Sequence, residues 1–291
     1  MVTEAGTHRR GQVYAALAAL AWSLAGVLQR ELSVSTATQI AGRAFFAFFA
    51  LLLFVLLSER RGIVRPFTTM GAAGWAVTGC TVIATSTFIV ALNHTTVANV
   101  LFLQALSPLA AALLAWVGLR EAVSRRTLMA MVVAIGGVAL MVGGPGGARG
   151  IGLALSLAMT LAFAVALVIT RHRRDVSMGP AMCLAQLVVL IAWAPFSQPG
   201  TIGGHDLGVM ALLGVVQMAG GLAFVTMAAR LIPAAEVALI TLLEVVLGPL
   251  WVWVFLNEQP GAATLVGGAI VLGAVAIQAG GDAEPQPLAV P

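Results

Sequence analysis

The sequence predicts an all-α, polytopic membrane protein with ten transmembrane helices, arranged as two inverted five-helix repeats around a central cavity. Of the 291 residues, 60% are hydrophobic and only 9% are charged, whereas ordinary soluble domains carry about 25% charged residues. The charges lie between long uncharged stretches such as 66–119 and 176–205. Because a bilayer-spanning helix needs about 20 apolar residues, these stretches predict repeated membrane crossing. They exclude a secreted, disulfide-built or nucleic-acid-binding chain.

Ten helices follow from dividing the chain at charges, at glycine and proline clusters and by length. The stretch 66–119 is too long for one span, and its polar cluster at 93–96 supplies a turn that divides it in two. The expected helices are 11–29, 36–58, 70–92, 95–118, 127–144, 150–170, 178–197, 207–230, 234–256 and 262–280.

The distribution of arginine predicts the orientation of these helices. With the N-terminus inside, the inner segments hold twelve arginines and the outer ones hold only two, Arg30 and Arg149. This excess is the positive-inside bias, and a missed helix would have scrambled it. We therefore expect a bacterial-type inner (plasma) membrane protein with both termini in the cytoplasm.

The chain also repeats itself. An offset of 137 residues aligns 98–144 with 235–281 and pairs Trp116 with Trp253. Each copy holds five helices, an odd number, so the second copy enters the membrane in the opposite orientation. Inverted repeats are typical of secondary transporters, whose substrate site lies near the midplane between the halves. The predicted units are 11–144, 150–280 and a cytoplasmic tail at 281–291.

Two segments carry a family resemblance. ALNHTTVANVLFLQALSPLAAALLAWVGLREAVSRRTLMAMVVAIGGVALMV (91–142) and AAEVALITLLEVVLGPLWVWVFLNEQPGAATLVGGAIVLGAVAI (234–277) resemble the EamA-type repeat of the drug/metabolite transporter superfamily. Arg43 matches the second-helix arginine of that family. The resemblance implies a ten-helix permease that exports amino acids, nucleobase-like metabolites or drugs, and the exporters of aromatic and other large neutral amino acids look most similar. One departure is that Glu244 is followed by Val245, where the family often has proline.

Ionisable groups at membrane depth are the first candidates for a substrate site, because each costs at least about 2.5–3.5 kcal/mol to insert. Arg43 lies inside the expected second helix and Glu244 lies near the middle of the ninth. Glu236 lies near a helix start, where the helix dipole favours a carboxylate, and is interpreted as a helix-terminus residue. We expect Arg43 and Glu244 to line the cavity and to be the candidates for proton coupling, if transport is coupled to protons at all.

The repeat alignment adds polar and aromatic candidates. Gln104 overlies Thr241 and Ser107 overlies Glu244, which places polar groups at i and i+3 on one face of the fourth and ninth helices. Bonding between helices is the alternative interpretation of this stripe. The remaining candidates are Trp22 and Phe163 as aromatic walls, Gln217 inside the eighth helix, and Pro108 and Pro249 as helix kinks that free backbone carbonyls.

Other activities lack the residues they need. All 15 basic residues are arginine, so the phosphate-binding lysine of an ATPase and the Schiff-base lysine of a pyridoxal enzyme are absent. No H-E-x-x-H motif occurs, and Asp175, Asp206 and Asp282 lie in expected loops or in the tail. Cys80 and Cys183 are interpreted as core residues. We therefore expect no enzyme activity, catalytic residue, cofactor or metal, and sugar-phosphate exchange is disfavoured.

The function that these patterns predict is secondary transport by alternating access. The expected cargo is an amino acid or a similar small metabolite, with neutral, bulky or aromatic amino acids favoured by the family resemblance. The alternative on the same fold is export of cationic drugs, other small metabolites or lipids, with Glu244 as the partner of the cation. The expected partners are the small-molecule substrate and the lipid bilayer, without nucleic acid, and a monomer can enclose the cavity.

Overall fold

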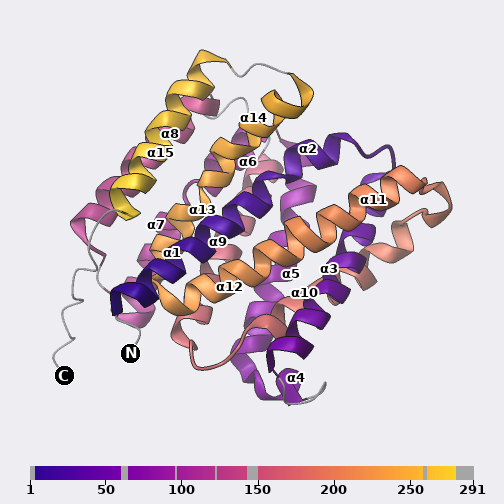
Figure 1. The fold of residues 1–291 in the computed structure, drawn as a ribbon, viewed down its shortest axis with the longest axis horizontal. Helices are drawn as coiled ribbons and strands as arrows, with labels where there is room; N and C mark the ends of the chain where they lie inside the picture. Colours follow the sequence, from indigo (N-terminus) through magenta and orange to yellow (C-terminus); the bar gives the residue numbers. More distant parts are fainter. Residues whose placement is uncertain are drawn as a thin grey trace.

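The computed structural model describes residues 4–59, 65–95, 97–121, 123–142, 150–257 and 261–279, and this part of the chain is all helical, without a strand (Figure 1). Glu258, Arg149 and the expected tail at 281–291 lie outside the described residues. The helices are α1 (Glu4–Ser23), α2 (Ala25–Arg30), α3 (Thr36–Glu59), α4 (Arg65–Thr69), α5 (Gly71–His94), α6 (Val97–Gln104), α7 (Ser107–Leu119), α8 (Arg125–Val142), α9 (Gly150–His172), α10 (Gly179–Trp193), η1 (Ala194–Phe196), η2 (Pro199–Thr201), α11 (Gly204–Leu212), η3 (Leu213–Gly220), α12 (Gly221–Leu231), α13 (Ala234–Thr241), α14 (Leu243–Leu256) and α15 (Ala262–Ala279).

Where the structure describes them, all ten expected ranges are mostly helical. The largest difference is at the start of the chain, where α1 begins at Glu4 instead of residue 11. Within the described residues, eight helical segments are long and apolar enough to cross a membrane, and a ninth, Ala262–Ile277, is apolar but shorter. The chain is therefore a multi-pass membrane protein, and the count of ten crossings stays a prediction.

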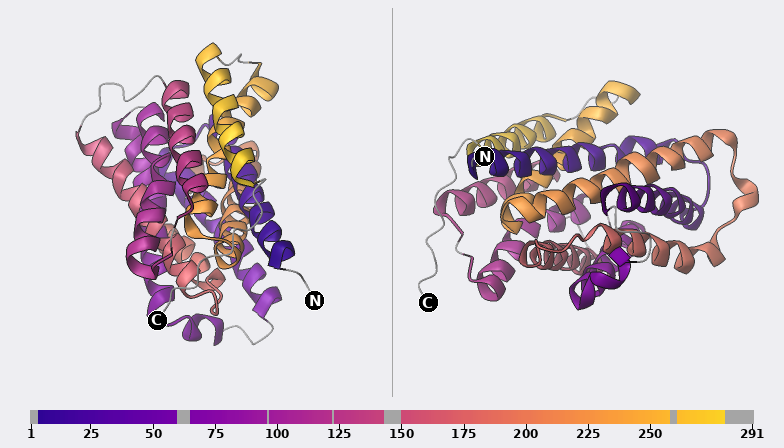
Figure 2. Two further views of the ribbon diagram at one scale, coloured as in Figure 1. Left: turned by 90° about the vertical axis from the view of Figure 1, so that its left-hand side faces the viewer. Right: turned by 60° about the horizontal axis from the view of Figure 1, so that its bottom comes forward.

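Helix contacts between the two halves have counterparts between the corresponding helices. α5 of the first half packs along α9 of the second. Their counterparts, α12 for α5 and α1 for α9, also pack along each other, as Figure 2 shows. Close approaches repeat in the same way. A Cβ added to Gly11 would lie 2.6 Å from Ile232, and one added to Gly152 would lie 2.5 Å from Thr95. Residues 95 and 232 are related by the 137-residue offset, so this symmetry fits the inverted repeat.

Four interruptions divide the spans and surround the centre of the molecule. Leu24 separates α1 from α2, residues 105–106 separate α6 from α7, and Leu242 separates α13 from α14. The fourth interruption is η3, a π-helix inserted between α11 and α12. Positions 105 and 242 are again related by the 137-residue offset, so the fourth and ninth spans break at corresponding points.

The two breaks have different relations to proline. Pro108 lies in the first turn of α7, where its missing N–H has no helical acceptor to lose, so it marks the break between α6 and α7. Pro249, which the sequence suggested as the corresponding kink, lies inside α14, and that helix continues through it. The break in the ninth span lies earlier, at Leu242, whose N–H turns back to the Leu239 carbonyl at 3.2 Å. A tight turn therefore interrupts this span without a proline.

The Leu103 carbonyl at the first break accepts two hydrogen bonds, one from the Leu106 N–H at 3.1 Å and one from a neighbouring helix. The Thr160 hydroxyl of α9 lies 3.1 Å from the Leu103 carbonyl and 2.9 Å from the Ser156 carbonyl of its own helix. A carbonyl has two lone pairs, so the Thr160 hydroxyl adds a bond between helices to the turn that Leu106 and Leu103 form.

The helices α8 and α15 form a tightly packed pair at one side of the bundle (Figure 1). A Cβ added to Gly137 would lie 2.8 Å from the Gly267 carbonyl oxygen, and one added to Gly267 would overlap the Gly137 oxygen. The backbones therefore touch, as small residues allow in membrane helix pairs. The same pair borders the main apolar core, which α7, α12 and α13 complete with residues such as Ala111, Val225 and Leu239.

We predict that Gly267→Leu destabilises the protein, because the added side chain would meet the backbone of α8. Overpacking of this kind costs about 1–3 kcal/mol. Gly273→Leu on the same helix is the matched control, since nothing lies within 4 Å of a Cβ added there. Thermal unfolding of the purified protein in detergent measures both, and equal midpoints for the two variants would contradict close packing at Gly267.

We also predict that Thr160→Val destabilises the protein by about 0.5–1.5 kcal/mol more than Thr170→Val. Both threonines are buried in α9, but the Thr170 hydroxyl bonds only to the Ala166 carbonyl of its own helix. Only the Thr160 substitution removes a bond between helices. The difference between the two unfolding midpoints is the test. Equal midpoints would show that the Thr160 bond to the Leu103 carbonyl does not contribute to stability.

Candidate functional site

A cavity of about 700 Å³ lies between the two halves. The volume is within the range of about 300–1,000 Å³ found for small-molecule sites. Residues of α1, α2, α3, α5, α6 and α7 line it from the first half, and residues of α9, α10, η3, α12, α14 and α15 line it from the second. The inverted halves therefore enclose one chamber at the interface where the sequence predicts a substrate site.

Most residues singled out in the sequence meet at this cavity. The lining includes Trp22, Arg43, Gln104, Ser107, Phe163, Gln217, Glu244 and Pro249. Thr241 and Pro108 are not among the lining residues. The Thr241 side chain is buried, and its hydroxyl donates to the Ala238 carbonyl of its own helix at 2.8 Å. The corresponding position in the other half, Gln104, does reach the cavity, so the two copies have diverged at this point.

A polar pair joins the two halves across the cavity. The Gln104 side-chain amide donates to the Glu244 carboxylate. Gln104 is the last residue of α6 and Glu244 is the second residue of α14, so both side chains come from helix ends created by the breaks. The interruptions of the fourth and ninth spans therefore bring a carboxylate and its hydrogen-bond donor to the middle of the molecule.

An aromatic pair forms part of the wall. The rings of Trp22 on α1 and Phe163 on α9 lie 5.7 Å apart at 70°, an edge-to-face arrangement that is favourable between aromatic side chains. These two positions correspond in the repeats at an offset of 141 residues. Their contact shows that corresponding points of the first and sixth spans face each other at the cavity.

Several lining residues were not expected from the sequence. Threonines contribute hydroxyls, and methionines contribute flexible apolar surface that adapts to ligands of different shape. A signal existed for the third span, where Thr81 and Thr85 lie four residues apart and therefore share one helix face. The unexpected lining residues include Thr81, Thr85, Phe88, Met159, Thr160, Thr170, Met182, Met218 and Thr226.

The cavity is open at one end of the bundle and closed at the other. Where α2 ends and α15 begins, Gly26 is exposed and Gln29 and Thr264 are half-buried. We call this end the mouth. Toward the end where α1 begins, which we call the N-terminal end, the lining residues Thr170 and Ala229 are fully buried. Among the described lining residues, the exposed surface therefore lies at the mouth.

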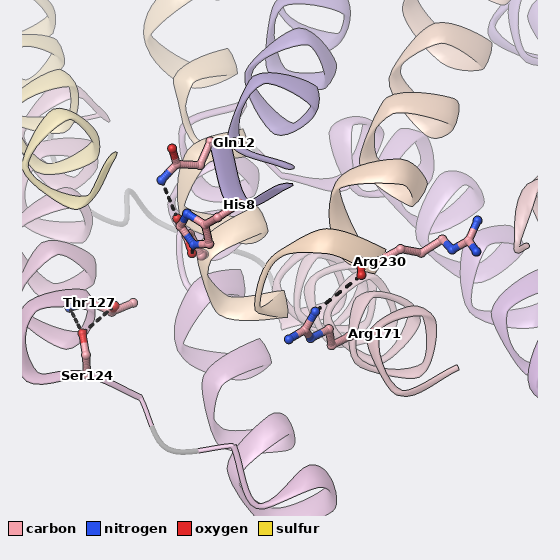
Figure 3. Close-up of polar contacts among 7 residues, drawn as sticks. His8, Gln12, Ser124, Thr127, Arg171 and Arg230 are labelled. Carbon is pink, nitrogen blue, oxygen red and sulfur yellow. Dashed lines mark hydrogen bonds and ion pairs between the residues drawn. The ribbon is translucent and has the colours of Figure 1, made fainter. Parts of the chain in front are cut away.

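Polar contacts at the N-terminal end join α1 to α13. His8 Nε2 lies 3.0 Å from one oxygen of Glu236, and the Gln12 amide donates to the other oxygen at 2.9 Å, as the dashed lines from His8 and Gln12 show in Figure 3. Glu236 lies in the first turn of α13, as the sequence suggested, and only 4% of it is exposed. The carboxylate thus holds the two halves together beneath the closed end of the cavity.

A second set of contacts joins α9 to its neighbours at the same end. Arg171 Nε donates to Glu121 at 3.1 Å. Its Nη1 lies 3.5 Å from the Arg230 carbonyl, as the dashed line in Figure 3 shows. Arg230 in turn donates to the Arg174 carbonyl at 2.8 Å. We refer to the residues of both sets as the N-terminal polar cluster, which comprises His8, Gln12, Glu121, Arg171, Arg230 and Glu236.

Comparison with known proteins identifies the family. Residues 9–143 and 150–279 each match the model of the EamA-like transporter family. The pseudopaline exporter CntI of Pseudomonas aeruginosa (strain UCBPP-PA14) is 26% identical to this chain, and the match covers 91% of this chain and 94% of that protein. A solved crystal structure matches 92% of this chain and 96% of its own with a TM-score of 0.79 at 16% identity, which supports the fold. The chain belongs to the EamA-like transporter family, whose members are transporters and not enzymes.

Proposed function

We propose that this transporter exports amino acids with neutral, bulky or aromatic side chains across the inner membrane by alternating access. The observation that carries the proposal is the composition of the cavity wall. Among the described lining residues, Arg43 and Glu244 are the only ionisable ones, and the rest of the wall is mostly apolar. One cation, one carboxylate and an apolar surface together complement a zwitterion with an apolar side chain.

The apolar part of the wall suits a large side chain. Trp22, Phe163 and Phe88 supply aromatic surface, and Met159 and Met218 supply adaptable surface. A volume of about 700 Å³ leaves room for a whole amino acid, because ligand sites of this size bury drug-sized molecules. These features favour bulky neutral amino acids over small ones.

Alternating access is supported by the difference between the two ends of the cavity. The mouth is open, while the N-terminal polar cluster joins the halves at the other end. The arginine distribution predicts that the N-terminal end faces the cytoplasm. In that orientation the structure is the outward-open state, from which an exported molecule leaves. Ten crossings, with the units 11–144 and 150–280 rocking against each other, complete the proposed cycle, and one monomer is sufficient for it.

A second candidate is export of cationic drugs, other small metabolites or lipids through the same cavity. The observation that favours it is that Glu244 is the one carboxylate among the described lining residues, which suits a cation that lacks a carboxylate of its own. The pseudopaline exporter relative supports the direction of transport in either case.

Flux into proteoliposomes tests the proposed substrate class. We expect purified, reconstituted protein to exchange labelled phenylalanine or leucine, and a panel of the twenty amino acids to compete in the order of their apolar size. A lack of flux for every amino acid, with protein shown to be correctly inserted, would contradict amino-acid export.

Glu244→Gln distinguishes the two candidate functions. If Glu244 binds the ammonium group of an amino acid, the substitution should weaken amino-acid competition about tenfold, as expected for a lost bond to a charged group. Glu31→Gln is the control, because this exposed carboxylate lies outside the cavity lining. A loss confined to organic cations, with amino-acid flux unchanged, would favour the drug-export candidate instead.

The closure at the N-terminal end predicts a change in side-chain accessibility. In a background with Cys80→Ser and Cys183→Ala, the Ala229→Cys reporter at the closed end should react slowly with a membrane-impermeant thiol reagent supplied from the N-terminal end. Arg171→Gln combined with Glu236→Gln should accelerate this reaction about tenfold, which corresponds to roughly 1.4 kcal/mol of lost closure energy. In the same double variant, the labelling rate of a Gly26→Cys reporter at the mouth should instead fall.

The matched control is Arg173→Gln, which removes an exposed ion pair to Asp175 at the same end of the bundle. Exposed pairs contribute little, so labelling at residue 229 should stay at its original rate. Unchanged labelling in the Arg171 and Glu236 double variant as well would show that these contacts do not hold the cavity closed.

A further inference from the structure

Arg43 is a buried cation for which the described part of the protein supplies no counter-charge. Only 3% of the residue is exposed, and its Nη2 atom is buried without a hydrogen-bond partner. Within the described ranges, no ion pair or hydrogen bond joins its side chain to another residue. Arg43 nevertheless lines the cavity. The guanidinium therefore lies at the wall of the chamber with unused hydrogen-bonding capacity.

The position of Arg43 is fixed by close packing of α3 on the π-helix η3. A Cβ added to Gly214 of η3 would lie 2.7 Å from the Arg43 carbonyl oxygen and 2.9 Å from the Ala47 nitrogen. The backbones of the two elements are thus in contact at this residue. Arg43 lies seven residues inside α3, which is about 10 Å from its start at 1.5 Å per residue. The side chain consequently comes from a rigid element within the membrane and not from a loop.

An unpaired guanidinium at this depth is costly. Arginine keeps its proton in proteins, so it cannot avoid the cost by becoming neutral, and buried charges are normally paired or hydrogen-bonded. The other ionisable lining residue, Glu244, accepts a hydrogen bond from Gln104 and forms no ion pair with Arg43. Within the described residues, no carboxylate of the cavity wall is therefore paired with Arg43.

A second lining residue, Gln217, also has a buried polar atom without a hydrogen-bond partner among the described residues. Gln217 belongs to η3, the element packed on α3 beside Arg43, and only 6% of it is exposed. Its Oε1 atom is also buried without a partner. Two neighbouring elements thus present a donor and an acceptor that are not satisfied by the described protein.

We propose that Arg43 is the carboxylate subsite of the cavity and that the transported molecules are defined by a carboxylate group. This inference rests on the proposed transport function and names its substrate class. The planar guanidinium fork matches a carboxylate through two parallel hydrogen bonds. Gln217 Oε1 accepts a hydrogen bond from an N–H group of the same ligand. The apolar remainder of the ligand then lies against the walls that Trp22 and Phe163 form.

Competition by matched analogues tests the subsite. Phenylalanine, phenylalaninamide and phenethylamine share one ring, but only phenylalanine carries a carboxylate. Against flux of labelled phenylalanine through the wild-type protein, we expect the two carboxylate-free amines to need about 10- to 100-fold higher concentrations for half-inhibition. In Arg43→Gln the preference should collapse to within a few fold, and Arg43→Lys should restore part of it. Arg65→Gln, an exposed arginine outside the cavity, should retain the full preference.

The outcomes separate this inference from the proposed function. Phenylalanine flux with equal inhibition by all three analogues would overturn the carboxylate subsite while leaving amino-acid export intact. A preference that persists in Arg43→Gln would also overturn it. A merely structural role for Arg43 would lower the flux of every substrate alike and leave the ratio between the analogues unchanged.

A binding measurement covers the case in which no amino acid is transported. We expect 3-phenylpropanoate to raise the unfolding temperature of the purified wild-type protein, and 3-phenylpropanamide and phenyl phosphate to raise it less. The stabilisation by 3-phenylpropanoate should be lost in Arg43→Gln and retained in Arg65→Gln. Stabilisation of the wild type by phenyl phosphate alone, or by none of the three compounds, would refute the carboxylate subsite whatever the cargo is.

Discussion

The structure depends on one constraint, the need to satisfy every backbone N–H and C=O group without water. Helices satisfy it within themselves, and irregular backbone at membrane depth is tolerated where it is covered by protein or lines a cavity. The interruptions at Leu24, at residues 105–106, at Leu242 and along η3 each lie beside residues that line the cavity. The Thr160 bond to the Leu103 carbonyl shows how such a site is stabilised. The places where the helices break are therefore the places where the protein can hold a polar ligand.

The positions of the helices were predictable from the sequence, because a membrane helix is defined by the length and the apolar composition of one continuous segment. The repeat alignment also fits the contacts, since the close approaches at Gly11 and Gly152, which correspond at an offset of 141 residues, involve Ile232 and Thr95, which correspond at 137. Side-chain direction was harder to predict. Gln104 and Thr241 correspond in the alignment, yet only Gln104 faces the cavity, because the short Thr241 side chain bonds to its own helix. Position in a repeat gives the helix face, and the length of the side chain decides whether it reaches the centre.

Proline was another source of difference between sequence and structure. The missing N–H of Pro249 removes one bond from α14, but the helix continues, since neighbouring helices in a membrane protein can compensate for such a loss. The break at Leu242 has no proline, and it corresponds to the break beside Pro108 in the first half. Symmetry between the copies was therefore a better guide to this break than residue type. The threonines Thr160 and Thr170 on α9 were missed for a different reason, because a threonine in an apolar helix commonly bonds to its own backbone.

The two charges at the cavity connect recognition to the transport cycle. Glu244 already has a donor in Gln104, so its cost of burial is partly offset before a ligand arrives. Arg43 has no such partner among the residues that the structure describes, and closing the mouth over an empty cavity would remove the remaining access of water to that charge. Closure over a bound carboxylate would instead form an ion pair in a low-dielectric site, where the attraction is strong when the hydrogen-bond geometry is good. If Arg43 is the carboxylate subsite, the loaded protein changes state more readily than the empty one. Selectivity for the carboxylate and resistance to cargo-free cycling would then follow from a single unpaired arginine.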